Sequence, residues 1–164
     1  MDRWGDWERK KKAESRRLKA VKAEGELLRV KETIDCEIRV RYAETDQMGV
    51  AYYSNYLVWF EVGRSEVCRR RGFSYAKLEA LGYKLVVTDV HCHYRNSARY
   101  DEIVTVRTWL KGVHKRMITF GYQILRKDHH QEEVIAEGET RHLCLGSNGT
   151  PKSLPQEFFD LLAK

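Results

Sequence analysis

The sequence predicts an α+β domain in which one long helix packs against an antiparallel sheet of five strands. One long segment, residues 55–71, carries apolar residues at helical spacing. Segments with strand-like alternation occur once before it and four times after it. Strands that follow a helix as a group, rather than alternating with helices, favour α+β over α/β.

The first strand and the long helix are indicated by a change of period. Apolar and charged residues alternate over residues 36–42, which is typical of a strand with one buried face. Residues 44–55 read as a loop, and Ser54 and Asn55 are residue types that start helices. The helix itself is marked by Tyr56, Trp59, Phe60, Gly63 and Val67. It should end at Gly72, after three arginines that suit a helix C-terminus.

The remaining elements follow in order along the chain. Gly63 inside the predicted helix costs about 1 kcal/mol relative to alanine, so we expect another backbone to pass close to it. A short helical turn is predicted at residues 75–81. Four alternating segments then predict strands at 84–95, 102–113, 115–126 and 133–145. A turn cluster at 146–151 and a short helix at 156–163 complete the domain.

Residues 1–33 differ in texture from the rest of the chain. They are rich in Lys, Arg, Glu and Ala and carry only a thin apolar stripe, which predicts a charged extension, either helical or disordered. Residues 34–164 are expected to form the globular domain. The acids interspersed in the extension argue against nucleic-acid binding, and the net charge of +6 suits an anionic ligand.

Composition limits where the protein can reside and whether it binds a metal. No stretch approaches the roughly 18 apolar residues of a membrane span. No export signal opens the chain, so we expect a cytoplasmic protein. The four cysteines are widely spaced, which favours buried, reduced thiols over a zinc site. His91 and His93 share a strand face, but no third ligand is evident, so the sequence predicts no metal and no cofactor.

Two carboxylates, Glu44 and Asp46, lie just before the predicted helix. Amide groups in the first turn of a helix are free and carry a partial positive charge. A carboxylate that faces them provides a base or nucleophile together with oxyanion donors, which is the minimum for hydrolysis of an ester or thioester. The spacing equally allows Asp46 to cap a turn or the helix, and spacing alone favours that simpler role.

The segment around Asp46 resembles the signature of the hotdog-fold acyl-CoA thioesterases of the 4-hydroxybenzoyl-CoA thioesterase type. The matching residues are Thr45, Asp46, Gly49, Val50, Tyr52, Asn55, Tyr56, Leu57, Phe60, Glu61 and Arg64. Residues 94–102 resemble the family's turn before the third strand, and the resemblance covers about residues 36–160. Two positions depart from it, because Tyr53 stands where many relatives carry His and Ser97 stands where Pro is usual.

The resemblance implies a hotdog fold, with one long helix wrapped by a five-stranded antiparallel sheet. It implies hydrolysis of an acyl-CoA to the free acid and CoA, in lipid metabolism, with Asp46 as the base or the nucleophile. The implied backbone donors to the thioester carbonyl are Tyr53, Ser54, Asn55 and Tyr56. The site would lie between subunits, so a homodimer or homotetramer is expected, acting on CoA or acyl carrier protein thioesters.

Further residues are expected near the site. Tyr52, Glu61 and Arg64 would line or support the pocket, although Glu61 could equally pair with Arg64 three residues on. Arg95 and Arg99 would meet the CoA phosphates. A hotdog hydratase or dehydratase is a rival activity, but it typically needs a His near the helix. A non-catalytic acyl-thioester binding protein is a second rival, and it would keep the pocket without turnover.

Overall fold

The computed structural model describes residues 32–128 and 131–163. The predicted extension, apart from residues 32 and 33, lies outside these residues, as do residues 129, 130 and 164. The strands are β1 (Thr33–Arg39), β2 (Tyr83–Tyr94), β3 (Ile103–Val113), β4 (Met117–Asp128) and β5 (Gln131–Gly146). They form one antiparallel sheet in the order β1-β3-β4-β5-β2. The helices are α2 (Asn55–Arg70), α3 (Tyr75–Ala80) and α4 (Gln156–Ala163), and η1 (Tyr42–Glu44) is a 3-10 turn.

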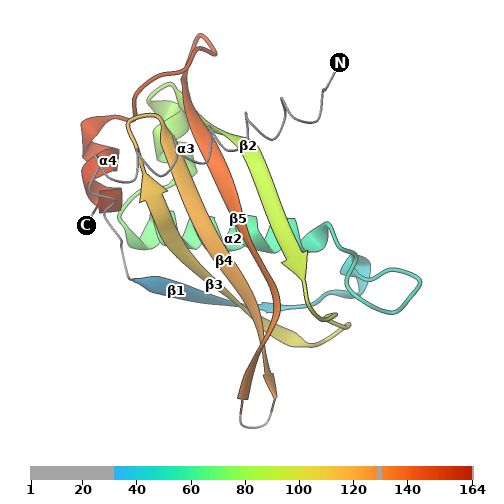
Figure 1. The fold of residues 1–164 in the computed structure, drawn as a ribbon. Helices are drawn as coiled ribbons and strands as arrows, with labels where there is room; N and C mark the ends of the chain where they lie inside the picture. Colours follow the sequence, from blue (N-terminus) through green and yellow to red (C-terminus); the bar gives the residue numbers. More distant parts are fainter. Residues whose placement is uncertain (1–31, 129–130, 164) are drawn as a thin grey trace, which may run out of the picture.

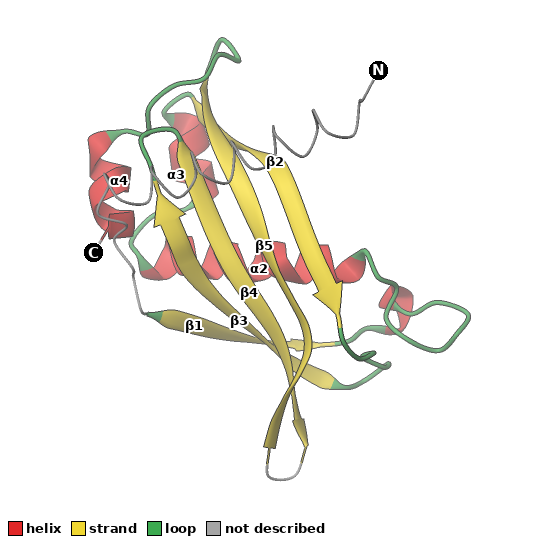
Figure 2. Cartoon of the chain, viewed as in Figure 1, coloured by secondary structure: helices red, strands yellow, loops and turns green. Residues whose placement is uncertain are grey.

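Helix α2 lies across one face of the sheet, and α3 and α4 lie together near one end of it (Figures 1 and 2). This arrangement confirms the predicted α+β class and the five antiparallel strands. The fully buried side chains of Trp59 and Phe60 come from α2, and Phe60 stacks on Tyr122 of β4 with ring centroids 4.2 Å apart. The core therefore lies between α2 and the sheet.

Helix α2 packs tightly against the sheet at Gly63. A Cβ placed on Gly63 would lie 2.2 Å from Thr108 Oγ1 and 2.8 Å from Val106 Cγ1, both on β3. α2 does pack tightly at Gly63, but the expected close backbone is not what is found, because the nearest atoms are side chains of β3. Because Gly63 has no side chain, α2 can pack directly against β3.

The end of α2 follows the predicted pattern. Gly72 has φ +92°, and its N–H donates to Arg69 O at 3.0 Å. The N–H of Phe73 donates to Cys68 O at 3.1 Å. These two bonds are those of a Schellman motif, which needs a left-handed residue that glycine supplies without strain.

Strand β2 forms one edge of the sheet and is interrupted by a bulge. Its register against β5 shifts between Val87 and Asp89. Before the bulge the more protected residues are Tyr83 and Leu85, and after it Cys92 is protected instead. The simple alternation expected along this strand is therefore wrong, because the extra residue exchanges the two faces.

All four cysteines are free thiols. Cys68 and Cys144 are buried as expected, whereas Cys36 and Cys92 are half-buried. Burial raises the pKa of the Cys68 thiol to about 12. Among the described residues, no helix combines the length and the apolar character needed to cross a membrane.

Candidate active site

The loop that joins η1 to α2 carries Asp46 at its tip. A bridge between Thr45 and Ala51 closes the loop, and the N–H of Asp46 donates to Val50 O at 2.9 Å. The N–H of Gly49 donates to Asp46 O at 2.9 Å, and Gly49 has φ +74°. Residues 46–49 are thus a tight turn that holds the backbone of Asp46 in place.

The Asp46 carboxylate is half-buried and has one oxygen engaged. Its Oδ1 accepts a hydrogen bond from the Met48 N–H at 2.8 Å. Among the described residues, no donor contacts the other oxygen. Asp46 therefore caps its own turn, as the simpler reading allowed, but it does not cap helix α2. The second oxygen is left to accept a proton or to attack an electrophile.

Glu44, the other carboxylate of the pair, is buried and holds the loop together. Its side chain accepts from the Arg41 N–H at 2.8 Å, from Arg41 Nη2 at 3.0 Å and from Trp59 Nε1 at 3.1 Å. Burial acts to raise the pKa of Glu44, but these hydrogen bonds outweigh it and leave the pKa below its ordinary value. Glu44 is therefore an ionised anchor between the loop and α2. Sequence reasoning missed this role, although the three-residue spacing from Arg41 was a signal for it.

The first turn of α2 presents free amide groups next to this loop. Within residues 32–128 and 131–163, no acceptor contacts the N–H groups of Tyr53, Ser54 and Tyr56. The Asn55 N–H is different, because it donates to Tyr52 O at 2.9 Å. The donor role expected for Asn55 stays a prediction, and its amide is the one of the four that already has an acceptor in the turn. The helix dipole adds partial positive charge at the three free donors.

Aromatic side chains surround the start of α2. The rings of Tyr52 and Tyr53 lie 4.6 Å apart, and both side chains are exposed. The Tyr53 phenol raises the pKa of Tyr52, and the charge of Asp46 adds to that effect. Tyr94, at the end of β2, donates its hydroxyl to Tyr53 O at 3.0 Å and packs edge-on against Tyr56. The end of β2 therefore borders the loop that carries Asp46.

Glu61 and Arg64 pair with each other rather than with the loop. Their charged groups lie 3.7 Å apart, and the Glu61 side chain is 65% exposed. The Arg64 side chain is mostly buried, with an Nε atom that has no hydrogen-bond partner among the described residues. Of the two roles expected for Glu61, the structure shows the ion pair with Arg64.

The two arginines expected to meet CoA differ in their surroundings. Arg95 pairs with Glu137 at 2.6 Å. Arg99 is exposed and makes no ion pair within the described part of the chain. His91 and His93 are both exposed, and no group of metal-ligating side chains large enough to hold an ion occurs among the described residues. A pocket of about 250 Å³ lies at the other end of α2, lined by Glu32, Ile34, Arg70, Arg71 and Leu161, and is therefore remote from Asp46.

Comparison with known proteins gives concordant matches. The model of the thioesterase-like superfamily matches residues 40–162. YneP of Bacillus subtilis, named provisionally as an acyl-CoA thioesterase, is 38% identical over 109 residues, covering 66% of this chain and 77% of that protein. A DHNA-CoA thioesterase from Staphylococcus aureus superposes with a TM-score of 0.72 at 36% identity, covering 78% of this chain and 85% of that one.

A more distant solved structure shares the fold alone. A variant of 4-hydroxybenzoyl-CoA thioesterase, in complex with 4-hydroxybenzoyl-CoA, superposes with a TM-score of 0.73 at 14% identity. The overlap covers 79% of this chain and 98% of that one. The hotdog fold that the sequence resemblance implied is thereby confirmed.

Proposed function

The chain belongs to the thioesterase-like superfamily and is a thioester hydrolase, and from this premise we propose that it hydrolyses acyl-CoA with Asp46 as the catalytic carboxylate. The observation that carries the proposal is that one loop holds an available carboxylate and leads into free backbone amides at the start of α2. Asp46, with one carboxylate oxygen free of donors among the described residues, lies on a hydrogen-bonded turn in the loop before α2, and the N–H groups of Tyr53, Ser54 and Tyr56 have no acceptor among those residues. We further propose a cytoplasmic role in lipid metabolism, with residues 34–164 as the catalytic domain.

The proposed reaction uses these groups in two roles. The N–H groups of Tyr53, Ser54 and Tyr56 are available to the thioester oxygen, where they would stabilise the negative charge that develops as the carbonyl carbon is attacked. As a base, Asp46 takes a proton from water, the resulting hydroxide adds to the carbonyl carbon, and the C–S bond breaks. The CoA thiolate then leaves and is protonated, and the acid is released.

As a nucleophile, Asp46 would add to the carbonyl carbon and expel the CoA thiolate, leaving a mixed anhydride that water then cleaves. Hydrolysis in ¹⁸O-labelled water under single-turnover conditions separates the two routes. Attack by water on the carboxyl carbon of Asp46 would leave the label in the protein. Direct attack of activated water on the substrate places it only in the acid product.

We propose that the enzyme is a homodimer that pairs through the edge strand β2. Val87, Val90 and Tyr94 on this strand are 48%, 47% and 41% exposed. β1, at the other edge, is shorter and presents the charged residues Asp35, Glu37 and Arg39, which protect an edge against pairing. Antiparallel pairing of β2 with the same strand of a second copy is self-complementary. Because Tyr94 contacts the Asp46 loop through Tyr53, such an interface would border the site.

A thiol-release assay with a panel of acyl-CoA and acyl carrier protein thioesters tests the activity. The panel should span short, long and aromatic acyl groups, and the acid product should be identified by mass spectrometry. We expect stoichiometric release of CoA and free acid from at least one class. Saturable binding without thiol release would instead indicate the non-catalytic binding protein. Hydration of a 2-enoyl-CoA with no thiol released would indicate the hydratase.

A further inference from the structure

The turn between β2 and β3, residues 95–102, is fastened to the candidate site through one residue. Ala98 is completely buried. Its N–H donates to the Tyr56 hydroxyl at 3.0 Å, and its carbonyl accepts from the Ala51 N–H at 2.8 Å. Tyr56 lies in the first turn of α2, and Ala51 closes the loop that carries Asp46. Ala98 therefore makes hydrogen bonds to both parts of the candidate site, the first turn of α2 and the loop that carries Asp46.

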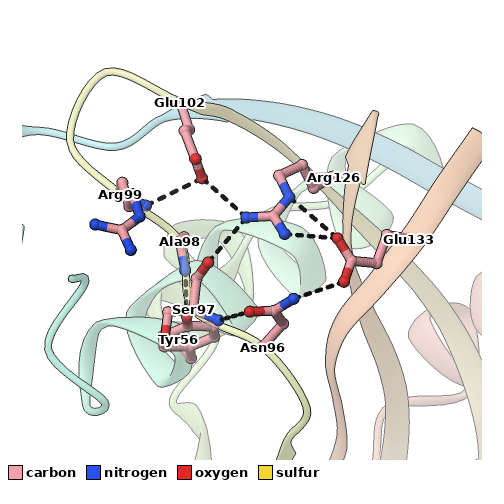
Figure 3. Close-up of polar contacts among 8 residues, drawn as sticks. All are labelled: Tyr56, Asn96, Ser97, Ala98, Arg99, Glu102, Arg126 and Glu133. Carbon is pink, nitrogen blue, oxygen red and sulfur yellow. Dashed lines mark hydrogen bonds and ion pairs between the residues drawn. The ribbon is translucent and has the colours of Figure 1, made fainter. Parts of the chain in front are cut away.

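Arg126, on β4, holds this turn from the other side (Figure 3). Its Nη1 donates to Ser97 O at 3.0 Å, and its Nη2 lies 2.6 Å from Glu133 Oε2. Its Nη1 also lies 3.5 Å from the carboxylate of Glu102. One planar guanidinium therefore connects β4 to β5 and to both ends of the turn.

The two carboxylates that face Arg126 extend this contact into the turn. Glu133 Oε1 accepts from Asn96 Nδ2 at 2.7 Å, and Glu102 Oε2 accepts from the Arg99 N–H at 3.0 Å (Figure 3). The hydrogen bonds to Glu133, followed by the charge of Glu133 and Glu102, raise the pKa of Arg126. No proline occurs in residues 95–102, so the backbone here has no built-in restraint on φ. The polar contacts supply that restraint.

We propose, on the basis of the hydrolysis proposed above, that Arg126 is a positioning residue for catalysis. By fixing residues 96–99 it fixes Ala98, and Ala98 in turn sets the distance between the Asp46 loop and the first amides of α2. Arg126 makes no contact with Asp46 itself, so its effect would be on geometry. Small displacements of reacting groups lower turnover strongly, while binding of the distant parts of the substrate is less affected.

Arg107 on β3 provides a matched control. It pairs with Asp35 at 2.8 Å and with Glu132 at 3.0 Å, and its side chain is 27% exposed, against 24% for Arg126. Each arginine thus bridges acidic residues on the sheet, but Arg107 makes no contact with the turn at 95–102. The substitutions R126M and R107M remove the same charge and keep a similar volume.

The test measures kcat, KM and amide hydrogen exchange in both variants, using whichever thioester the wild-type enzyme hydrolyses best. We expect R126M to lose about tenfold to hundredfold in kcat, with a smaller change in KM. The Ala51 and Ala98 amides should exchange faster in R126M. R107M should keep the wild-type kcat and the same protection, with a comparable fall in melting temperature. R126K, which keeps the charge but not the planar fork, should give an intermediate kcat and decides the matter where R126M fails to fold.

Wild-type kcat in R126M, or an equal loss of kcat in R107M, would overturn the positioning role. The exchange measurement stands apart from the proposed function. If the wild-type protein hydrolysed no thioester, the proposed activity would fail, while unchanged protection of Ala51 and Ala98 in R126M would still refute the contact between Arg126 and the site.

Discussion

Replacing Gly63 by alanine tests how α2 is held on the sheet, because two physical effects then oppose each other. In an isolated helix the added methyl group stabilises by about 1 kcal/mol. In this structure the new Cβ would lie 2.2 Å from Thr108 Oγ1 and 2.8 Å from Val106 Cγ1. Favourable contact between heavy atoms needs about 3.5–4.0 Å, so the helix or the strand must move.

The magnitude follows from comparing the two terms. Overpacking of a well-filled core costs about 1–3 kcal/mol, and two contacts below 3.0 Å on one strand favour the upper half of that range. After subtracting the helix-propensity gain, we expect G63A to lower the free energy of unfolding by about 1–2 kcal/mol. For a chain of this size this corresponds to a fall in Tm of roughly 2–8 °C.

Urea unfolding of G63A, T108A and the double variant measures this directly. T108A removes the nearer of the two contacting atoms, so the double variant should be less destabilised than the sum of the single variants. The Thr108 hydroxyl has no hydrogen-bond partner among the described residues, so T108A alone loses little on that account. If G63A were as stable as the wild type or more stable, helix propensity would outweigh packing and the close approach of α2 would be wrong.

Three further predictions concern the loop, a buried histidine and the edge strand. E44Q should lower stability by about 1–3 kcal/mol at neutral pH. Folding lowers the pKa of Glu44, so its contribution to the free energy of unfolding is present above the pKa of the unfolded chain. That contribution is lost as the pH falls through the pKa of the folded state. The free energy of unfolding of E44Q in urea should therefore vary less with pH over this range than that of the wild type. Burial, together with the charge of Arg64, lowers the pKa of His142 from 6.5 to about 4. The free energy of unfolding should therefore fall by about 3 kcal/mol as the pH drops across that interval. Urea unfolding of H142Q over the same range should show a smaller fall. V90K, on the exposed edge of β2, should convert the proposed dimer to a monomer in analytical ultracentrifugation, and a wild-type protein that sediments as a monomer would rule out pairing through β2.

Local patterns in the sequence were sufficient for most of the elements. Alternating patterns predicted the bounds of the five strands to within a few residues, although the faces of β2 were predicted wrongly because of its bulge. The short helix at 156–163 and the end of α2 at Gly72 were also predicted, since apolar spacing and a left-handed glycine are local signals. Gly63 correctly indicated tight packing, because glycine destabilises the interior of a helix and tight packing against a neighbour offsets that loss.

The features that were missed depend on residues distant in the sequence. The bulge between Val87 and Asp89 is set by the pairing of β2 with β5, which no local pattern encodes. The use of the Asn55 amide in the turn depends on how the loop closes. The contact of Arg126 with Ser97 spans 29 residues and becomes visible only when β4 and the turn are side by side. That Asp46 and the amides at the start of α2 act together on a substrate stays a prediction.

The kcat of D46N on the best acyl-CoA substrate tests the central claim most directly. Asparagine keeps an Oδ1 that accepts from the Met48 N–H, so the turn should survive while the charge is lost. D160N, on α4, is the control, because Asp160 is exposed there and contacts Gln156. We predict a fall in kcat of about 10²–10⁴ in D46N, with circular dichroism unchanged, and wild-type kcat in D160N. A D46N enzyme that kept its kcat within about threefold of wild type would contradict the catalytic role of Asp46.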